Sequence, residues 1–313
     1  MTTRAGTGKT PREIRAAKAV ALAIAYLPAI ATFAVVTAVG IAGGGFHPDS
    51  WRFSTVAPLA LAGATLTLRE RIALARREWA MLAALGGLGA WTAASALWSI
   101  HPSNSVLESE RVLLYVVGLA VVLLALEGAA LPQVVAGAVA GMTAVSLVGL
   151  REQYLVAHPL SPIEGNLLFQ PLGYANALGM YAAIGILLAV GLALWARPWP
   201  ARAAALAPCL VLVPTLALTS SRGAWVALAI GMVAMLHFGR RVRSRSLLLT
   251  LLAAGVVAGV LIGSNKGQNL SILGQYRPHY WHVALDEYAA NPVLGGGAGT
   301  FGDYFWRFHR PAG

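Results

Sequence analysis

The chain has 313 residues, of which 58% are hydrophobic and 11% are charged, and its formal net charge is +11. Soluble domains contain about 25% charged residues and roughly 45–50% apolar ones. A soluble protein of this size cannot bury so much apolar surface and still cover its exterior, which excludes an ordinary soluble enzyme, a disordered chain and a DNA-binding domain. The composition predicts a polytopic membrane protein built as an all-α helical bundle.

Nine apolar runs approach the length of about 20 residues that a spanning helix needs. They cover roughly 19–42, 54–68, 79–98, 112–126, 132–150, 174–196, 203–219, 223–238 and 247–263. The first run is too long for the core of a signal peptide, so we take it as the first spanning helix. Residues 127–131 separate the fourth run from the fifth, which predicts a tight helical hairpin.

Small residues and prolines predict how these helices pack and bend. A face formed by Gly137, Gly141 and Ala144 suits close helix packing. Prolines inside the apolar runs predict kinks, because neighbouring helices can satisfy the carbonyl groups that a proline frees. These prolines are Pro28, Pro58, Pro208 and Pro214.

The basic residues flank the apolar runs, so membrane topology explains the charge better than a nucleic-acid partner does. With a cytoplasmic N-terminus, most of the 23 Lys and Arg residues fall in cytoplasmic segments. We therefore expect a cytoplasmic basic N-terminus (1–18), a transmembrane helical bundle (19–263) and an extracytoplasmic segment (264–313) in the cytoplasmic membrane. The single cysteine, Cys209, cannot form an internal disulfide, and no Cys/His metal spacing is present.

Two stretches contain polar and charged residues that a spanning helix does not need. Residues 95–111 end a span at the outer interface, where an aromatic belt and a capped helix start explain them without chemistry. The stretch TSSRGAW (219–225) places Arg222 between two spans. Snorkelling of its side chain to the interface is one explanation. The other is a fixed guanidinium that binds phosphate with two parallel hydrogen bonds.

A third stretch, 276–301, predicts a short amphipathic helix that ends at Pro292 and the glycines after it. Its apolar side chains share one helical stripe, made of Trp281, Ala284, Leu285 and Tyr288. An interfacial helix without chemistry is one explanation. The other is that Arg277 faces Arg222 across a cavity, where two arginines would hold a diphosphate. The GxGxxG pattern at 297–302 has no βαβ unit around it, so it predicts a turn.

Three short motifs resemble, in their order and spacing, the O-antigen ligase/polymerase family of membrane glycosyltransferases. They are SRGAW at 221–225, R-x-x-x-W-x-x-A-L at 277–285 and NPVLGGGAGTF at 291–301. Residues 95–111 and the run GYANALGMY (173–181) resemble the same family. The likeness spans roughly residues 90–305 and is strongest at 215–301.

The resemblance implies an all-helical bundle with a large outer loop late in the chain. It also implies transfer of a glycan from a polyprenyl-diphosphate carrier to a glycan, lipid or protein acceptor, at the outer face of the cytoplasmic membrane and without a metal or other cofactor. Arg222 and Arg277 match the family's functional arginines and would stabilise the departing diphosphate. Tyr280, Trp281 and Trp225 are candidates to pack on the sugar or the isoprenoid, with an aromatic belt as the alternative explanation.

Similar proteins continue into a helix whose histidine activates the acceptor. His279, His282 and His309 do not lie in the matching motif, so none takes that role here. We therefore expect a C-terminally truncated chain that holds the donor side of the site, and its activity alone stays an open question. Two other functions stay open: an anion transporter of the bicarbonate type, against which the lack of central ionisable residues counts, and a non-catalytic membrane scaffold.

Overall fold

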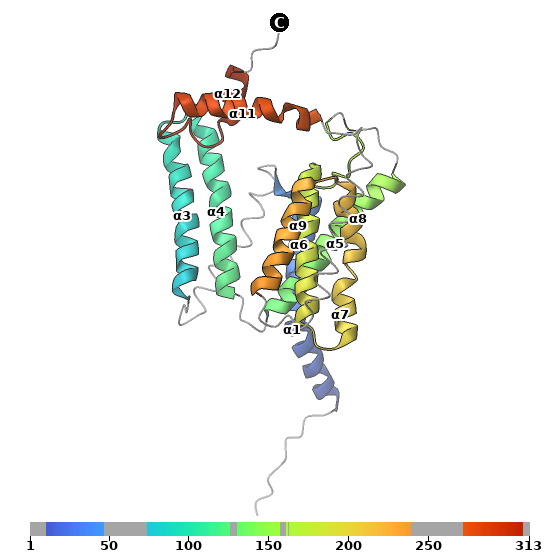
Figure 1. Cartoon of the computed structure of the whole chain (residues 1–313). Helices are drawn as coiled ribbons and strands as arrows, with labels where there is room; N and C mark the ends of the chain where they lie inside the picture. Colours follow the sequence, from blue (N-terminus) through green and yellow to red (C-terminus); the bar gives the residue numbers. More distant parts are fainter. Residues whose placement is uncertain are drawn as a thin grey trace, which may run out of the picture.

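The structure is a computed structural model of the chain and describes residues 11–46, 74–125, 130–156, 161, 163–238 and 272–308. In this part the regular elements are helices, with one isolated β-bridge between Ser161 and Gly165 (Figure 1). The all-helical class predicted from the composition is therefore confirmed for the described residues.

A helix satisfies the polar groups of its own backbone, which suits an apolar chain in a membrane. In chain order they are α1 (Pro11–Ile41), α3 (Arg76–Ala94), α4 (Pro102–Ala125), α5 (Leu131–Leu155), α6 (Ala175–Trp195), α7 (Trp199–Leu206), α8 (Cys209–Leu218), α9 (Arg222–Phe238), α11 (Ile272–Ala290) and α12 (Phe301–Phe308). Two 3-10 turns, η1 (Gly43–Gly45) and η2 (Ser95–Leu97), follow α1 and α3.

Four helical segments in the described residues are long and apolar enough to cross a membrane. They are Arg76–Leu97, Leu131–Leu155, Ala175–Trp195 and Trp199–Leu218. Two shorter helical segments, Tyr26–Ile41 and Arg222–Met235, are also apolar. The count of nine spans is therefore not confirmed. The runs predicted at 54–68 and 247–263 lie outside the described residues.

Helix α6 lies at the centre of the larger group of helices and packs against α5, α7, α8 and α9. Small side chains along α6 let its neighbours approach closely. The buried cluster around it consists of Ala182, Ala183, Ile186, Val190, Leu212, Leu216, Ala224, Leu228 and Met232. This cluster holds the start of α9, and thus Arg222, at one end of α6.

Helix α1 packs on α5 across the small-residue face predicted from the sequence. A β-carbon on Gly137 would collide with the carbonyl oxygen of Ala29. One on Gly141 would lie 2.9 Å from Cγ1 of Val36. The backbones approach so closely because both positions lack a side chain, which confirms the close packing expected at Gly137 and Gly141.

Of the four prolines predicted to bend helices, Pro208 lies at an interruption between two helices. Residues 207–208 separate α7 from α8, so the run predicted as one span at 203–219 is two helices in line. Pro208 has no backbone N–H to continue the ladder of hydrogen bonds. Pro28 and Pro214 lie inside α1 and α8. Pro58 lies outside the described residues.

Helices α3 and α4 form a pair of their own, joined by η2 and the residues up to His101. Figure 1 shows them side by side, apart from the group around α6. The hairpin predicted between the fourth and fifth apolar runs is wrong, because α4 packs on α3 whereas α5 packs on α1, α6 and α8. Equally apolar helices offer many partners in a membrane, and their order along the chain does not choose among them.

Helix α11 lies across the end of the α3–α4 pair, next to α12 (Figure 1). The predicted helix is confirmed and ends before Pro292, but it is longer than expected and shows no single apolar face. Val283 is buried, whereas Trp281, Leu285 and Tyr288 are exposed. Apolar side chains therefore occupy opposite sides of α11.

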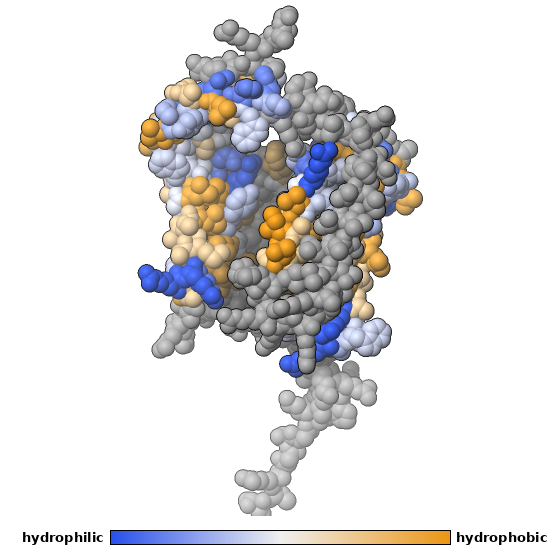
Figure 2. Space-filling view, viewed as in Figure 1, coloured by the Kyte–Doolittle hydropathy of each residue, from blue (hydrophilic) through white to orange (hydrophobic). Residues whose placement is uncertain are grey.

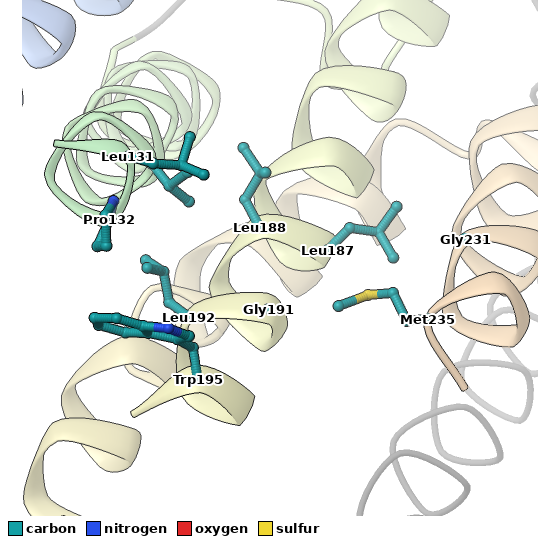
Figure 3. A pocket seen from close by; sticks show the side chains of 10 residues that line it. Leu131, Pro132, Leu187, Leu188, Gly191, Leu192, Trp195, Gly231 and Met235 are labelled. Carbon is teal, nitrogen blue, oxygen red and sulfur yellow. The ribbon is translucent and has the colours of Figure 1, made fainter. Parts of the chain in front are cut away.

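Arginines gather at the end of the molecule opposite α11. Arg76 and Arg77 begin α3, and Arg197 and Arg202 lie around the connection from α6 to α7. Figure 2 shows hydrophilic residues near both ends of the molecule and hydrophobic ones in the band between them. This distribution is typical of a protein whose middle lies in a lipid bilayer.

Candidate functional site

A sharp turn, Thr219–Ser221, joins α8 to α9 and sets the position of Arg222. The hydroxyl of Thr219 donates a hydrogen bond of 2.7 Å to the carbonyl of Leu216. Ser220 has a φ of 51°, in the left-handed region that non-glycine residues seldom adopt. The hydroxyl of Ser221 accepts a hydrogen bond of 3.3 Å from the N–H of Ala224, so Ser221 is the N-cap of α9. Arg222 follows as the first residue of the helix, exposed.

The turn packs against the first residues of α6, which belong to the GYANALGMY run. A β-carbon on Gly179 would lie 2.7 Å from the hydroxyl oxygen of Thr219 and 2.7 Å from Cβ of Ser221. The N–H of Leu168, in the loop before α6, donates a hydrogen bond of 3.2 Å to the carbonyl of Leu218. Two motifs that the sequence analysis singled out separately are thus in direct contact.

The location of Arg222 favours anion binding. The N-terminus of a helix carries a partial positive charge, which destabilises a basic side chain placed there and attracts a negative group. The guanidinium adds a full positive charge with a planar set of donors. An anion such as a phosphate would relieve the repulsion between Arg222 and α9 and form charge-assisted hydrogen bonds.

The aromatic candidates have different surroundings. Trp225 is partly buried and packs against the cluster around α6. Tyr280 is partly buried, and its ring lies 5.3 Å from that of Phe305 and 6.5 Å from that of Phe301, measured between centroids. The side chain of Trp281 is 71% exposed. Of the three side chains, Trp281 is the most exposed.

Arg277 lies in the first half of α11. The described side chains of this helix begin at Pro278. The expected pairing of Arg277 with Arg222 around one diphosphate therefore stays a prediction.

A second contact joins distant motifs at the same end of the molecule. We call residues 95–105 the socket and residues 291–300 the glycine loop. The hydroxyl of Ser105 donates a hydrogen bond of 2.9 Å to the carbonyl of Ala298. The N–H of Ala298 donates one of 3.0 Å to the hydroxyl of Ser95. One peptide segment of the glycine loop is thus held on both sides by two buried serines.

Further hydrogen bonds extend this contact along the loop. The indole N–H of Trp98 donates to the carbonyl of Leu294 at 3.1 Å, and the N–H of Ile100 donates to the carbonyl of Gly296 at 3.4 Å. The amide of Asn104 donates to the carbonyl of Gly299 and to the carboxylate of Asp303, each at 3.4 Å. Nε2 of His101 lies 3.5 Å from the carboxylate of Asp303.

The glycines are required because the loop and the socket are in backbone contact. Gly297 has a φ of 101°, and a β-carbon on it would lie 2.7 Å from Cα of Ser99. Gly299 has a φ of 74°, and a β-carbon there would lie 3.2 Å from the carbonyl oxygen of Asn104. These positive φ angles and short distances confirm that glycines of the GxGxxG pattern form a turn.

Charged groups support the socket and the loop. Arg111 on α4 binds both carboxylate oxygens of Glu108, at 2.9 and 3.0 Å. Its Nη2 also lies 3.5 Å from the carbonyl of Phe46, just after η1. Burial raises the pKa of the Glu287 carboxyl on α11, and a hydrogen bond from the backbone of Gly296 opposes that shift.

The socket residues Ser95, Asn104 and Ser105 escaped the analysis of the sequence. An aromatic belt with a capped helix start explained their segment, but Trp98 uses its indole N–H to bind the glycine loop. The resemblance of residues 95–111 to the family was the signal that this segment has a further role, because an aromatic belt at the interface does not require such a resemblance. Among the described residues, no group of three or more His, Cys, Asp and Glu side chains is placed to hold a metal ion.

Comparison with known proteins bears on this end of the molecule. A family model described as O-antigen ligase matches residues 207–313. The matched segment includes Arg222 and Arg277 and runs from just before α8 through the glycine loop. The match supports assigning the chain to the O-antigen ligase family, as its motifs indicated. No curated protein and no solved structure matches the chain.

Proposed function

We propose, from this assignment to the O-antigen ligase family, that the protein is a membrane glycosyltransferase. It transfers a glycan from a polyprenyl-diphosphate carrier to a glycan, lipid or protein acceptor. The observation that carries the proposal is Arg222, exposed at the N-terminus of α9 within the segment that matches the family. There the helix dipole and the guanidinium both favour a phosphate group.

The reaction breaks the bond between the anomeric carbon of the glycan and the diphosphate oxygen. The electron pair of that bond passes to the diphosphate, and the acceptor hydroxyl oxygen forms the new bond to the anomeric carbon. The acceptor hydroxyl loses its proton, which the released diphosphate or water takes up. Negative charge grows on the diphosphate as the bond breaks, so Arg222 and Arg277 stabilise the transition state more than the bound substrate. Trp281, with its exposed ring, is the candidate to pack on the sugar or the isoprenoid.

The same proposal orients the protein in the cytoplasmic membrane. Arg76, Arg77 and Arg197 lie at the end opposite α11. Since cytoplasmic loops are enriched in arginine and lysine, that end faces the cytoplasm, together with the N-terminus. Arg222, the socket and α11 then face outward, where a lipid-linked glycan presents its diphosphate at the membrane surface.

The test is glycan transfer in membranes that contain the native protein or its variants. We expect Arg222→Ala and Arg277→Ala to abolish transfer without changing the amount of inserted protein. Lysine at either position should restore little activity, because it lacks the planar fork of donors. Arg197→Ala, which removes an exposed arginine at the opposite end, is the matched control and should transfer normally.

Full transfer by Arg222→Ala would contradict the proposal. Uptake of a labelled anion into vesicles by a protein that transfers no glycan would favour the anion transporter instead. Binding of the lipid-linked glycan without transfer, unaffected by either arginine variant, would favour a scaffold.

A further inference from the structure

We infer that the socket between α3 and α4 positions α11 for glycan transfer, with Ser95, Asn104 and Ser105 as the positioning residues. The inference rests on the proposed function, because α11 carries Arg277. It assigns a role to the α3–α4 pair, which lies outside the segment that matches the family.

The socket holds the glycine loop through buried polar groups. Ser105 is completely buried and Ser95 is 4% exposed. The hydroxyl of Ser105 donates to the carbonyl of Ala298, and the hydroxyl of Ser95 accepts from its N–H. Both backbone polar groups of Ala298 therefore have hydrogen-bond partners without water or another side chain. Gly297 lets the loop backbone touch Ser99 directly. The loop is therefore fixed in one place against the socket.

The loop, the end of α11 and α12 form one unit. The N–H of Gly295 donates a hydrogen bond of 3.0 Å to the carbonyl of Asn291, the residue after α11. The side-chain amide of Asn291 donates one of 3.2 Å to the hydroxyl of Tyr304 on α12. Tyr304 is 3% exposed and packs against Gly296, which has no room for a β-carbon. A displacement of the loop therefore displaces α11.

Helix α11 extends away from the glycine loop, which fixes the C-terminal end of the helix. Figure 1 shows it extending from the α3–α4 pair toward the group of helices that contains α9. Arg277 and Ala290 are separated by about 20 Å along the helix, at roughly 1.5 Å per residue. A tilt of about 10° at the anchored end would move Arg277 by about 3 Å, and displacements of that size at a reacting centre lower rates by about 100-fold or more.

The contact between the glycine loop and the socket, here called docking, can be measured separately from glycan transfer. In a Cys209→Ala background, which removes the chain's single cysteine, Asn104→Cys and Asp303→Cys form a reporter pair. The native side chains at these positions are 3.4 Å apart. A short bifunctional thiol reagent then reports docking as the yield of internal cross-link, and the same reagent restores the anchor by bridging the two segments.

The perturbing variant is Gly297→Ala, whose methyl group would collide with Ser99 and force an alanine to a φ of 101°. Gly302→Ala makes the same chemical change in open space on α12. Gly295→Ala places an alanine at a positive φ without a collision, so it separates backbone strain from the contact. We expect Gly297→Ala to lower both cross-link yield and kcat by at least about tenfold, with a smaller change in the donor KM. Gly302→Ala should change neither.

The protein with the reporter pair lacks the hydrogen bonds of Asn104, so its kcat should be lower than that of the wild type. Joining residues 104 and 303 with the thiol reagent should restore most of the lost kcat. Normal transfer in Gly297→Ala despite a lost cross-link would overturn the inference and leave the proposed function standing. A normal cross-link yield in the reporter pair, together with no glycan transfer by the wild-type protein, would contradict the proposed function, and the inference with it. If Gly297→Ala does not insert, Ser105→Ala makes the same comparison by removing one hydrogen bond.

Discussion

Gly179 on α6 and Ser221 at the start of α9 touch each other: a β-carbon on the glycine would lie 2.7 Å from Cβ of the serine. Real side chains do not approach so closely, so the glycine is required for this packing. The contact joins the turn before Arg222 to the most buried helix of the described group. Arg222 is thereby held by rigid elements on two sides rather than by a loop.

The first prediction concerns this contact. Gly179→Ala should destabilise the protein by about 1–3 kcal/mol, as overpacking of a tight interior does, and should lower transfer by displacing the turn. Gly223→Ala is the control, since it lies beside Arg222 and has no heavy atom within 4 Å of the added methyl group. Thermal unfolding in detergent measures both. Equal stability of the two variants would show that the contact is not formed.

A second prediction separates the function of Arg222 from stability. A basic side chain in the first turn of a helix opposes the helix dipole by about 0.3–1 kcal/mol. Arg222→Ala should therefore unfold at a slightly higher temperature than the wild type at low salt, while transfer is lost. A drop in the unfolding temperature would mean that Arg222 serves the fold.

A third prediction concerns Glu164, in the loop between α5 and α6. The residue is 4% exposed, and its Oε1 has no hydrogen-bond partner among the residues that the structure describes. Burial raises the pKa of its carboxyl above the ordinary value of 4.5, and a hydrogen bond from the backbone of Ala175 opposes the shift. The folded protein thus holds the proton more tightly than the unfolded chain does.

This difference in proton affinity makes the stability of the folded protein decrease as pH rises. The stability that the neutral carboxyl contributes is complete below the unfolded pKa of 4.5 and is lost as pH rises through the higher folded pKa. In Glu164→Gln this decline should disappear, because the amide does not titrate and can still accept from Ala175. The measurement is the unfolding temperature of the wild type and of Glu164→Gln from below pH 4.5 to above the folded pKa of Glu164. Glu152→Gln on α5 is the control. A pH profile unchanged by Glu164→Gln would contradict the prediction.

A fourth prediction tests the packing of α1 on α5. Gly137→Ala should destabilise the protein by about 1–3 kcal/mol, since the methyl group meets the carbonyl of Ala29 and a backbone cannot move aside as a side chain does. Gly118→Ala on α4, with open space around it, should be neutral or slightly stabilising. Thermal unfolding distinguishes them, and similar values for both would rule out the close approach.

Local features of this protein follow from its sequence alone. The predicted run at 174–196 matches α6 (Ala175–Trp195), and the run at 223–238 matches α9 (Arg222–Phe238). Such agreement has a physical cause: a helix satisfies its own backbone in lipid, so an apolar run of sufficient length is enough to specify it. The break at Pro208 and the turn at Gly297 follow from backbone chemistry in the same way.

Only the tertiary structure decided which segments meet. Nothing in the sequence said that α4 pairs with α3 rather than α5, that Gly179 makes room for Ser221, or that Ser95 and Ser105 hold Ala298. Apolar side chains gain as much from lipid as from one another, so hydropathy does not select a helix's partner. Selection comes from close packing and from buried hydrogen bonds between residues far apart in the chain, and those contacts exist only once the helices have assembled.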